Sequence, residues 1–422
     1  MTITILAVGT RGDTEPYVAL GVALQQIGYR IRLASFENYR AYVESYGLEF
    51  FPVKGDVTQV LNTSVAKHAR NADNPLKVLL SFREMKKLVY DAQFDLYDAC
   101  TDAEAIIYHP GAMIGHYLAK KFGVPGILAT PFPMKPTRDY PALIFYKGPR
   151  MGGWWNEFTH RLFEKIMWSM SSGPIIQFWK AKFGSEPIVF HNPFLYQQQA
   201  EMPTIISCSS SIFPRSPKWN DAVHQLGYWF LDEDPNWQPP EELNIFLKNG
   251  PAPVYVGFGS VGDPTEAVQT TKLIINALQL AGQRGVIATG WAGLQESIAV
   301  PEGIYLLDHI PHAWLFPRMA VVVHHGGAGT SAAGFRAGIP CVIIPHANDQ
   351  FAWAKRAEEL GVAGPSIPRK RLRATKLAAS IQAALHPTVV SAAAKLGEQI
   401  RRENGAVFAA EIIQRTLRNN YL

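Results

Sequence analysis

Short apolar runs alternate with amphipathic stretches over the first 130 residues of the chain. The apolar runs predict buried strands, and apolar residues at helical spacing between them predict helices. Helices are expected at Tyr17–Ile27 and Asn38–Tyr46, and the expected strands are Thr2–Val8, Arg30–Ala34, Leu48–Val53, Ala105–Tyr108 and Gly126–Thr130. Strands separated by helices in this order predict an open parallel α/β sheet with helices on both faces.

This rhythm breaks at Pro131 and resumes near Val254. Residues 131–212 combine aromatic-rich helical stretches with proline and glycine loops, so we interpret them as an insertion. Residues 232–240 concentrate proline and acidic residues, as interdomain linkers do. Later strands are expected at Val254–Val256, Gly285–Thr289, Ile304–Leu307, Val321–Val323 and Cys341–Ile344, and an amphipathic tail helix at Ala392–Leu417.

The pattern divides the 422 residues into two α/β domains, expected at 1–231 and 241–397, followed by a terminal helix at 398–422. A chain of this length is too long for one ordinary core, which agrees with that division. Hydrophobic residues make up 47% and charged residues 18%, which leaves disordered, collagen-like and coiled-coil classes without support.

Charge and cysteine content narrow the classes of partner. The 40 basic and 35 acidic side chains give a net charge of +5, which permits anionic ligands but gives no support for a nucleic-acid partner. The three cysteines lie far apart without a C-x-x-C pair, so neither a metal site nor a disulfide framework is indicated and a reducing compartment fits best. No apolar run approaches the roughly 18 to 20 residues of a membrane-spanning helix. We therefore expect a cytoplasmic protein that is at most peripheral to a membrane.

The strongest chemical signal is a strand that turns through glycines into a helix at residues 321–331. Small residues let the backbone approach a ligand there, and the helix dipole favours negative charge, so the turn predicts a diphosphate site. His325 could donate a hydrogen bond or a positive charge to the same phosphates, and the alternative is that it caps the turn. The backbone N–H groups expected to point at the anion are those of Gly327, Ala328, Gly329 and Thr330.

Polar residues follow three other expected strands, at the sheet edge where ligands of open α/β sheets collect. Asp349 and Gln350 offer acceptors and donors suited to adjacent sugar hydroxyls, although alone they are more typical of a helix start. Asp13 is a candidate general base that accepts a proton from an attacking hydroxyl. The alternative is that Asp13 or Thr14 caps the helix that begins near Pro16. His109 is a competing base, or a partner that polarises Asp13.

Three further patterns carry weaker signals. Gly257–Gly262 matches the G-x-G-x-x-G of dinucleotide-binding loops, but the next strand ends without the acid that would hold a ribose. Asp232–Asp234 is an acid-rich triplet that could hold Mg²⁺ on a nucleotide diphosphate, although it falls in the linker. The basic cluster at 369–376 is most often a solvated face, with contact to anionic lipid as the alternative.

Six motifs, spread over nearly the whole chain, occur together in this sequence. They are Gly9-Thr-Arg-Gly-Asp13 with Pro16 and Ala19-Leu20, Pro131-Phe-Pro-Met-Lys-Pro-Thr137-Arg138, Gly257-Phe-Gly-Ser260, Ile310-Pro-His-Ala-Trp314-Leu-Phe-Pro317, His325-Gly-Gly-Ala-Gly-Thr330 and Asp349-Gln350. Together they resemble the UDP-glycosyltransferase superfamily, in the branch that holds sterol glucosyltransferases and bacterial antibiotic glycosyltransferases.

The resemblance implies the GT-B fold, in which two Rossmann-like domains face each other across a cleft and a carboxyl-terminal helix crosses back to the first domain. It implies that the first domain binds the acceptor and the second binds the nucleotide sugar. The implied reaction is an inverting, metal-independent transfer of a hexose such as glucose, with a UDP-sugar as co-substrate and no cofactor. By this resemblance Asp13 is the base, Ile310 contacts the nucleobase through its backbone, and Asp349 and Gln350 bind sugar hydroxyls. The residues that it places at the diphosphate are Gly259, Ser260, His325, Gly327, Gly329 and Thr330.

Three positions depart from the family pattern. His309 stands where relatives often stack an aromatic ring on uracil, and Ala333 stands where many carry a glutamate on the ribose. The choice of UDP over TDP as the nucleotide of the sugar donor therefore rests on family preference alone. His109 stands where an uncharged residue is more usual, so the base is either Asp13 or His109.

The acceptor is expected to be a small lipophilic alcohol such as a sterol, terpenoid, polyketide or lipid, because the aromatic insertion would form an apolar pocket wall. The candidate lining residues are Pro131, Phe132, Trp154 and Trp155. The alternatives are a hydrophobic core between helices and, for the two tryptophans, contact with a membrane surface. The rival functions are a non-catalytic binding protein on the same fold, against which the candidate base and the diphosphate turn argue, and a nicotinamide-dependent oxidoreductase.

Overall fold

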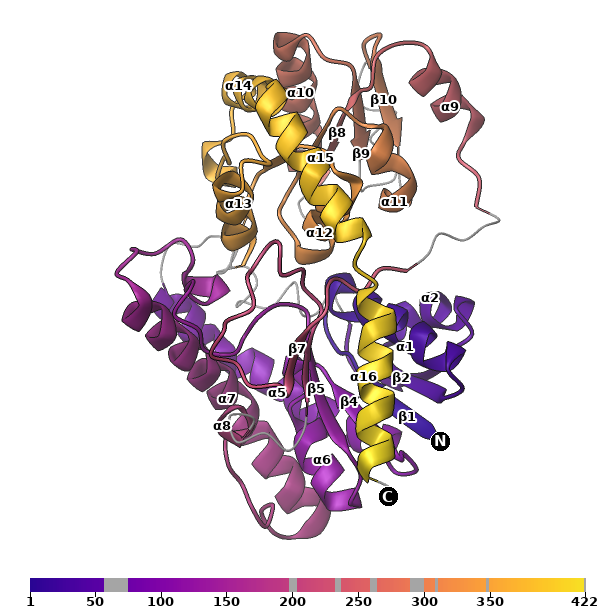
Figure 1. The fold of residues 1–422 in the computed structure, drawn as a ribbon, viewed down its shortest axis with the longest axis vertical. Coiled ribbons are helices and arrows are strands. Elements are labelled where there is room, and N and C mark those ends of the chain that lie inside the picture. The colour runs from indigo at the N-terminus through magenta and orange to yellow at the C-terminus, as the bar shows by residue number, and fades with distance from the viewer. Residues whose placement is uncertain are drawn as a thin grey trace. The chain divides into compact units, whose positions relative to one another are not determined.

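The computed structural model describes residues 1–56, 75–196, 203–231, 237–258, 264–288, 300–307, 310–346 and 349–420 (Figure 1). Of residues 75–86, 195–196, 264–267 and 420 it describes the backbone alone. The chain forms two compact units. Unit 1 comprises Met1–Leu231 together with Glu403–Leu422, and unit 2 comprises Asp232–Arg402.

Among the described residues, unit 1 holds a seven-stranded parallel sheet in the order β3-β2-β1-β4-β5-β6-β7. Ile5 pairs with Leu33 on one side and with Ile107 on the other, so the centre of the sheet is apolar. Continuous apolar runs are typical of parallel strands that helices cover on both faces. The strands are β1 (Thr2–Leu6), β2 (Arg30–Phe36), β3 (Glu49–Val53), β4 (Ala105–Tyr108), β5 (Gly126–Thr130), β6 (Thr204–Ile206) and β7 (Val223–Gln225).

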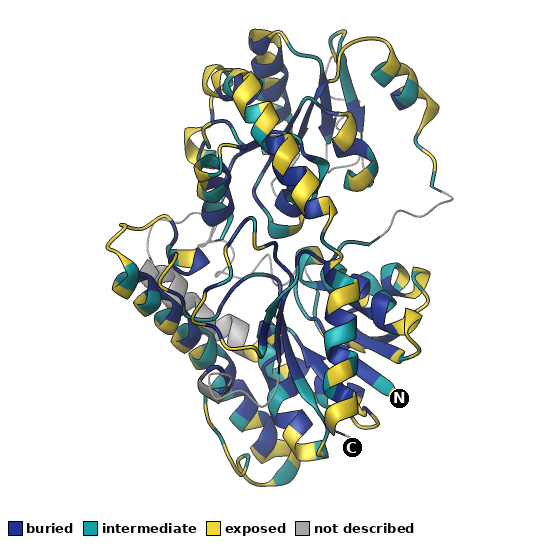
Figure 2. Cartoon of the chain, viewed as in Figure 1, coloured by how far each residue is buried: buried dark blue, intermediate teal, exposed yellow. Residues whose placement is uncertain are grey.

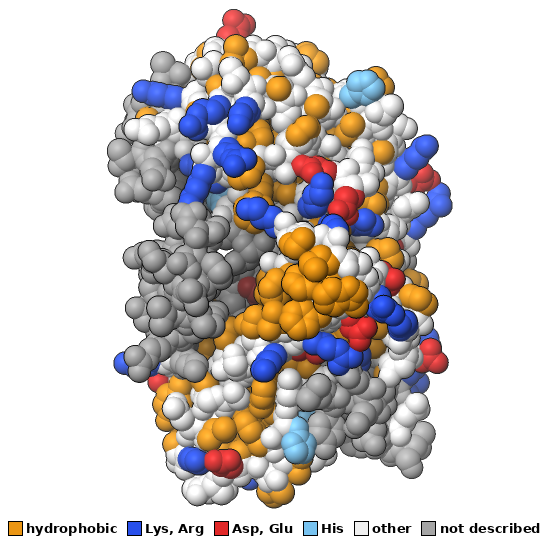
Figure 3. All heavy atoms as spheres, turned by 90° about the vertical axis from the view of Figure 1, so that its left-hand side faces the viewer, with side chains coloured by type: hydrophobic (Ala, Val, Ile, Leu, Met, Phe, Trp, Pro, Cys, Tyr) orange, Lys and Arg blue, Asp and Glu red, His pale blue; other side chains and the backbone are white. Residues whose placement is uncertain are grey.

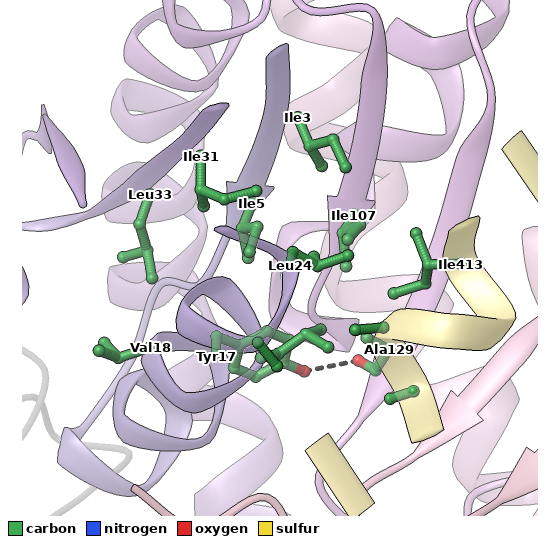
Figure 4. Packing of buried hydrophobic residues seen from close by; sticks show 14 of the residues in the cluster. Ile3, Ile5, Tyr17, Val18, Leu24, Ile31, Leu33, Ile107, Ala129 and Ile413 are labelled. Atoms are coloured by element: carbon green, nitrogen blue, oxygen red, sulfur yellow. Dashed lines mark hydrogen bonds between the residues drawn. The ribbon is translucent and has the colours of Figure 1, made fainter. Parts of the chain in front are cut away.

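One face of this sheet is covered by α1 (Arg11–Gln26) and α16 (Gly405–Asn420), which pack against each other. Their apolar side chains join Ile3, Ile5 and Tyr17 in one buried cluster (Figure 4). The outer sides of the helices are exposed, whereas the strands are buried (Figure 2). This amphipathic arrangement is what the helical spacing of apolar residues predicts.

The other face is covered by α5 (Pro75–Ala99), α6 (Ile114–Phe122) and α7 (Gly153–Phe183). Leu6, Tyr108 and Leu128 point to this side and lie in a second cluster with the aromatic residues of α7. The remaining short elements of unit 1 are α2 (Arg40–Ser45), α8 (Pro193–Tyr196) and the 3₁₀ turns η1 (Glu37–Tyr39), η2 (Pro110–Ala112) and η3 (Leu143–Phe145).

The end of the chain differs from the expected single helix at Ala392–Leu417. The helix α15 (Pro387–Arg401) belongs to unit 2, and α16 begins at Gly405 in unit 1, so that expectation is wrong. Glu403 lies in the break, where its Oε1 accepts a 2.6 Å hydrogen bond from the Ser209 hydroxyl. The terminal helix therefore belongs with the first unit, as the GT-B resemblance implies.

Among the described residues, unit 2 holds a five-stranded parallel sheet in the order β10-β9-β8-β11-β12. The strands are β8 (Val254–Gly257), β9 (Gly285–Ala288), β10 (Ile304–Leu307), β11 (Val321–His324) and β12 (Cys341–Ile343). The helices α10 and α14 pack together on one face, around Val256, Val323 and Leu377. The helices and 3₁₀ turns of unit 2 besides α15 are α9 (Glu241–Lys248), α10 (Pro264–Ala281), α11 (His312–Leu315), η5 (Phe316–Arg318), α12 (Ala328–Ala337), α13 (Gln350–Glu359), η6 (Arg369–Arg371) and α14 (Ala374–Ala384).

The expected α/β fold class is confirmed, because parallel strands alternate with helices in both units. The helix expected to begin at Tyr17 begins instead at Arg11, since its first turn is polar and breaks the apolar pattern. The helix expected at Asn38–Tyr46 is a 3₁₀ turn followed by the short α2. Among the described residues no single helix is long and apolar enough to span a bilayer, and residues 374–384 and 387–419 meet that test only as a pair bent by 67°.

Candidate active site

The first candidate residue lies in the turn that connects β1 to α1, here called the Asp13 turn (residues 9–13). Thr10 is the N-cap of α1, and Asp13 lies three residues later in its first turn. Asp13 Oδ2 accepts hydrogen bonds from the Thr10 backbone N–H at 2.7 Å and from the Thr10 hydroxyl at 2.8 Å. Asp13 Oδ1 instead lies 3.4 Å from Nε2 of His109. One oxygen of Asp13 therefore completes a capping box with Thr10, while the other faces a second candidate residue. The alternative that Asp13 or Thr14 is the N-cap of a helix beginning near Pro16 is wrong, because α1 begins at Arg11 and its N-cap is Thr10.

His109 follows β4 and engages both of its ring nitrogens. Its Nδ1 accepts a 2.9 Å hydrogen bond from the Gly111 backbone N–H. A ring nitrogen that accepts a hydrogen bond carries no proton, so in the neutral imidazole the proton is on Nε2 and faces Asp13. Burial lowers the pKa of His109, while the charge of Asp13 acts in the opposite direction. His109 is therefore a neutral donor toward Asp13 near pH 7.

The two side chains also differ in their access to a substrate. The Asp13 side chain is 31% exposed and the His109 side chain 12%. Tyr17 packs edge-on against the imidazole, with ring centroids 5.6 Å apart, and its hydroxyl donates a 2.5 Å hydrogen bond to the carbonyl of Ala129 (Figure 4). The imidazole is thus held in place by its neighbours, and the carboxylate of Asp13 is the more accessible acceptor of the pair.

In unit 2 a comparable turn connects β11 to α12, here called the His325 turn (residues 325–330). Gly326 has φ of +89°, a conformation that side chains disfavour, and its N–H donates a 3.0 Å hydrogen bond to Nδ1 of the buried His324. Gly327 is the N-cap of α12 and has no side chain with which to cap it. Within the described part of the chain, the N–H groups of residues 327–330 find no backbone acceptor. They are therefore available to an anion.

His325 lies against this helix start. A Cβ added to Gly327 would lie 2.6 Å from Nε2 of His325, so the imidazole sits directly beside the first turn of α12. Its Nδ1 is buried and has no hydrogen-bond partner among the described residues. Burial lowers the pKa of His325 to about 4, so the ring is neutral near pH 7. The sequence leaves open whether His325 offers the phosphates a hydrogen bond or a positive charge. In the free protein the neutral ring can donate a hydrogen bond but carries no positive charge.

Asp349 and Gln350 lie next to this turn. Asp349 is the N-cap of α13, and its Oδ2 accepts a 3.2 Å hydrogen bond from the indole N–H of Trp353. Gln350 Oε1 accepts a 2.7 Å hydrogen bond from the backbone N–H of His346. A Cβ added to Gly326 would lie 3.2 Å from the carbonyl oxygen of Gln350, so the two segments are in contact. The pair does begin a helix, and it does so beside the His325 turn.

Comparison with known proteins connects these features to a family. The model of the glycosyltransferase family 28 N-terminal domain matches residues 3–141, and that of the erythromycin biosynthesis protein CIII-like C-terminal domain matches residues 282–416. A sterol 3-beta-glucosyltransferase of Arabidopsis thaliana is 32% identical over 430 residues, which cover 99% of this chain and 68% of that protein. The chain belongs to the UDP-glycosyltransferase family. The sterol 3-beta-glucosyltransferase of Candida albicans is 34% identical over 426 residues, which cover 97% of this chain but only 27% of that longer protein.

Solved glycosyltransferase structures share the fold of this family member. The calicheamicin glycosyltransferase CalG4 superimposes with a TM-score of 0.71 over 98% of each chain, at 18% identity. The glycosyltransferase VinC, solved in complex with dTDP, gives a TM-score of 0.69 over 99% of this chain and 100% of its own, at 16% identity. These matches confirm the GT-B class of two α/β domains.

Other positions that the glycosyltransferase motifs assign are only partly described. Ile310 is 6% exposed and directly precedes the N-cap of α11. Ala333 lies within α12. Gly259, Ser260, His309 and the acidic triplet Asp232–Asp234 lie outside the described residues, as does most of the Gly257–Gly262 loop. In the basic cluster, Arg369 donates a 2.8 Å hydrogen bond to the hydroxyl of Thr270, so this arginine has a partner within unit 2.

The four candidate acceptor residues of this glycosyltransferase occupy two places in unit 1. Pro131 and Phe132 follow β5, and Phe132 packs against the cluster under α7. Trp154 and Trp155 lie together in the first turn of α7, and Trp154 is 57% exposed. Hydrophobic side chains gather on the face that Figure 3 presents, the left-hand side of Figure 1 on which α7 lies. Exposed apolar residues near the start of α7 are Ile144, Met151, Trp154 and Phe158.

Sequence reasoning missed three residues that shape these turns. Tyr17 belongs to the apolar stripe of α1, so nothing in the pattern separates its hydroxyl contact from ordinary packing. The bond of Thr10 to Asp13 depends on where α1 begins, which the polar first turn of this helix hides in the sequence. His324 carried a signal, since it adjoins His325 before the glycines, but its bond to Gly326 depends on the conformation of the turn.

Proposed function

We propose that this glycosyltransferase is inverting and metal-independent, and that it moves a hexose, with glucose as the first choice, from a UDP-sugar to the hydroxyl of a lipophilic acceptor. Unit 1 supplies the general base for the acceptor, and unit 2 holds the nucleotide diphosphate. The observation that carries the proposal is the pairing of a buried neutral imidazole with the accessible carboxylate of Asp13. No cofactor besides the sugar donor enters the reaction.

Asp13 is the base in this proposal. The acceptor hydroxyl gives its proton to the carboxylate of Asp13 while its oxygen attacks the anomeric carbon of the sugar. His109 already uses Nδ1 to accept from Gly111 and carries its proton on the nitrogen that faces Asp13. It has no lone pair left for the acceptor, so it acts as a positioning residue that orients the carboxylate.

The leaving group is stabilised at the His325 turn. As the bond between the anomeric carbon and the diphosphate oxygen breaks, its electron pair goes to the diphosphate. The open N–H groups at the start of α12 and a donor nitrogen of His325 are fixed before the reaction, so they stabilise this charge without reorganising. Attack from the side opposite to the diphosphate inverts the anomeric configuration.

Asp349 and Gln350 are the proposed contacts to the sugar hydroxyls. Both begin α13 in contact with the His325 turn, and each already holds one side-chain oxygen in a hydrogen bond. Side chains that are oriented in this way discriminate between hydroxyl configurations at low entropic cost. The matching positions in the family motif support the same roles.

The acceptor proposal rests on the relatives and on the surface of unit 1. The two curated relatives described above are named as sterol 3-beta-glucosyltransferases. Aromatic side chains of unit 1 are available for an apolar acceptor near α7. We therefore place a sterol first among lipophilic alcohols.

The deciding experiment is a matrix of UDP- and TDP-sugars against sterols, terpenoids, polyketides and lipid alcohols, followed by mass spectrometry. We expect the largest product yield with UDP-glucose and a sterol, and nuclear magnetic resonance should show a β-linkage from the α-linked donor. Retention of the α-configuration would exclude the proposed displacement. Absence of any product, with UDP bound, would favour a non-catalytic binding protein.

A further inference from the structure

A small pocket lies inside unit 1, between the sheet and α7. Its cavity volume is about 10 Å³, which is room for about one water-sized group. Its polar lining comes from Thr130 at the end of β5, Thr204 of β6, Lys135 of the following loop and Glu164 of α7. The remaining lining is apolar. None of these four side chains has a role in the candidate site described above.

Two of the polar side chains in this pocket are buried and make no hydrogen bond that is seen among the described residues. Glu164 is 4% exposed, and its carboxyl interacts there only through the nearby charges of Arg161 and Lys135. Thr130 is 1% exposed, and its hydroxyl also lacks a partner among the described residues. Leaving a buried polar group unsatisfied costs about 1–3 kcal/mol, and more for a charge. Such a cost is typical of a site that a ligand completes.

Electrostatics around Glu164 agree with that geometry. Burial raises the pKa of Glu164 to about 7, while the charges of Arg161 on the same helix and of Lys135 on the adjacent loop oppose the shift. Burial also lowers the pKa of Lys135. The carboxyl can therefore accept a hydrogen bond as an anion or exchange a proton with a neutral ligand group near pH 7.

The pocket lies one strand away from the proposed base. Tyr108 pairs with Leu128 in the register of β4 and β5, so His109 and Thr130 leave the same edge of the sheet on neighbouring strands. Adjacent strands are about 4.8 Å apart. Pro131 and Phe132, two candidate acceptor residues, continue the chain directly from Thr130. Thr130 shares the α7 side of the sheet with Leu128, whereas His109 packs on the α1 side against Tyr17, so an acceptor that places one hydroxyl at Asp13 has to extend across this edge of the sheet to place another in the pocket.

We propose that this pocket is a polar subsite for a second hydroxyl of the acceptor, one that donates to the carboxyl of Glu164 and accepts from the hydroxyl of Thr130. The inference rests on the proposed function in that it takes the ligand to be the acceptor. A hydroxyl fits because the space holds one small group, and because the two partners present one acceptor and one donor to it. The enzyme then prefers diols over alcohols that differ only by lacking this group.

The test compares pairs of acceptors that differ only in a second hydroxyl, placed at several distances from the first. In the wild type, we expect kcat/KM to be about tenfold higher for the best diol than for its mono-alcohol, the value of one hydrogen bond to a charged group. Glu164→Leu and Thr130→Val should each remove most of this ratio while the mono-alcohol keeps its rate. Glu164→Gln should restore part of it, because the amide oxygen still accepts. Glu186→Gln, which alters an exposed carboxylate paired with Lys180 near the end of α7, is the matched control and should change nothing.

Binding measured without a sugar donor separates this inference from the proposed function. Calorimetry of the same acceptor pairs should show the diol preference in the wild type and its loss in Glu164→Leu. If no acceptor is glycosylated but this binding preference holds, the subsite stands and the proposed function fails. If Glu164→Leu and Thr130→Val stay folded and keep the full diol ratio, the pocket holds only a structural water and the inference is wrong.

Discussion

The Asp13 turn of unit 1 and the His325 turn of unit 2 both carry the chain from a central parallel strand into a helix, yet they close in opposite ways. In the Asp13 turn, a carboxylate of the helix itself accepts from the N-cap residue. In the His325 turn, the N-cap is a glycine, and the first N–H groups of the helix are left without a backbone acceptor in the described residues. The first turn therefore holds a side chain in place, and the second leaves backbone donors open, as the proposed diphosphate site requires.

The two turns also share a hydrogen-bonding feature. In each, a buried imidazole accepts the backbone N–H two residues further on, from Gly111 to His109 and from Gly326 to His324. An imidazole can do this only while that nitrogen is unprotonated. Histidine thus serves as a fixed acceptor in both units, and its neutrality near pH 7 follows from burial.

The largest expected effect separates the two roles of Asp13. Asp13→Asn should lower kcat by roughly 10²–10⁴-fold, because the amide cannot take the acceptor proton although it can still accept from Thr10. Asp13→Ala should lose the same rate and in addition about 1 kcal/mol of stability through the lost cap. UDP affinity, measured by calorimetry, should be unchanged in both. An Asp13→Asn variant with normal kcat would move the base to another residue, with His109 as the first candidate.

The next effect concerns the diphosphate. His325→Ala should weaken UDP binding roughly ten- to hundredfold, the value of a hydrogen bond to a charged group. His386→Asn is the matched control, because His386 is an exposed histidine of unit 2 at a helix N-cap, where asparagine is also a good cap. Unchanged UDP affinity in His325→Ala would remove this side chain from the proposed diphosphate site.

Acid should weaken both turns. The pKa values of His109, His324 and His325 are lowered by burial, so below the ordinary value of 6.5 the unfolded chain binds more protons than the folded one. The contribution of these three histidines to stability should therefore be constant above about pH 6.5 and fall steadily as the pH is lowered toward 4. Thermal unfolding across this range measures the effect. His109→Asn, whose amide oxygen can accept from Gly111 without titrating, should lose less stability as the pH falls. A loss as steep as that of the wild type would contradict the role of His109 as a neutral acceptor.

The smallest effect distinguishes an open helix start from a closed one. A Cβ on Gly329 would meet no atom within 4 Å, so Gly329→Ala should raise the free energy of unfolding by about 0.5–1 kcal/mol through helix propensity. If a diphosphate approaches this backbone closely, the same methyl group should weaken UDP binding several-fold. A more stable variant with wild-type affinity would show that the anion lies elsewhere.

The fold was predictable from sequence because buried parallel strands such as Val321–Val323 are continuous apolar runs. The start of α1 was not, since Arg11, Asp13 and Glu15 make its first turn polar. The break between α15 and α16 was hidden for a different reason. Helical spacing continues across it, and Glu403 is held by Ser209, 194 residues earlier in the chain.

The sequence was enough to predict which residues are candidates for the site. It was not enough to predict their protonation and hydrogen bonding. Asp13 was readable as a cap or as a base, and only the separate surroundings of its two oxygens show that both roles are open to it. The proton position on His109 depends on Gly111, and the neutrality of His325 depends on burial, neither of which leaves a periodic signal. In the sequence, Glu164 is simply one acidic residue on an aromatic-rich helix. Its burial in the pocket depends on the packing of α7 against β5 and β6, which the sequence pattern does not show.

The placement of α16 has a consequence for how the chain matures. Unit 2 is one continuous stretch, whereas unit 1 is interrupted by it and completed only by the last helix. During synthesis from the amino terminus, all of unit 2 is available to fold while Ala409, Ile413 and Leu417 are still missing from the core around α1. Unit 1 is therefore begun before unit 2 and completed after it, and the helix that carries Asp13 gains its full support only once α16 has been synthesised.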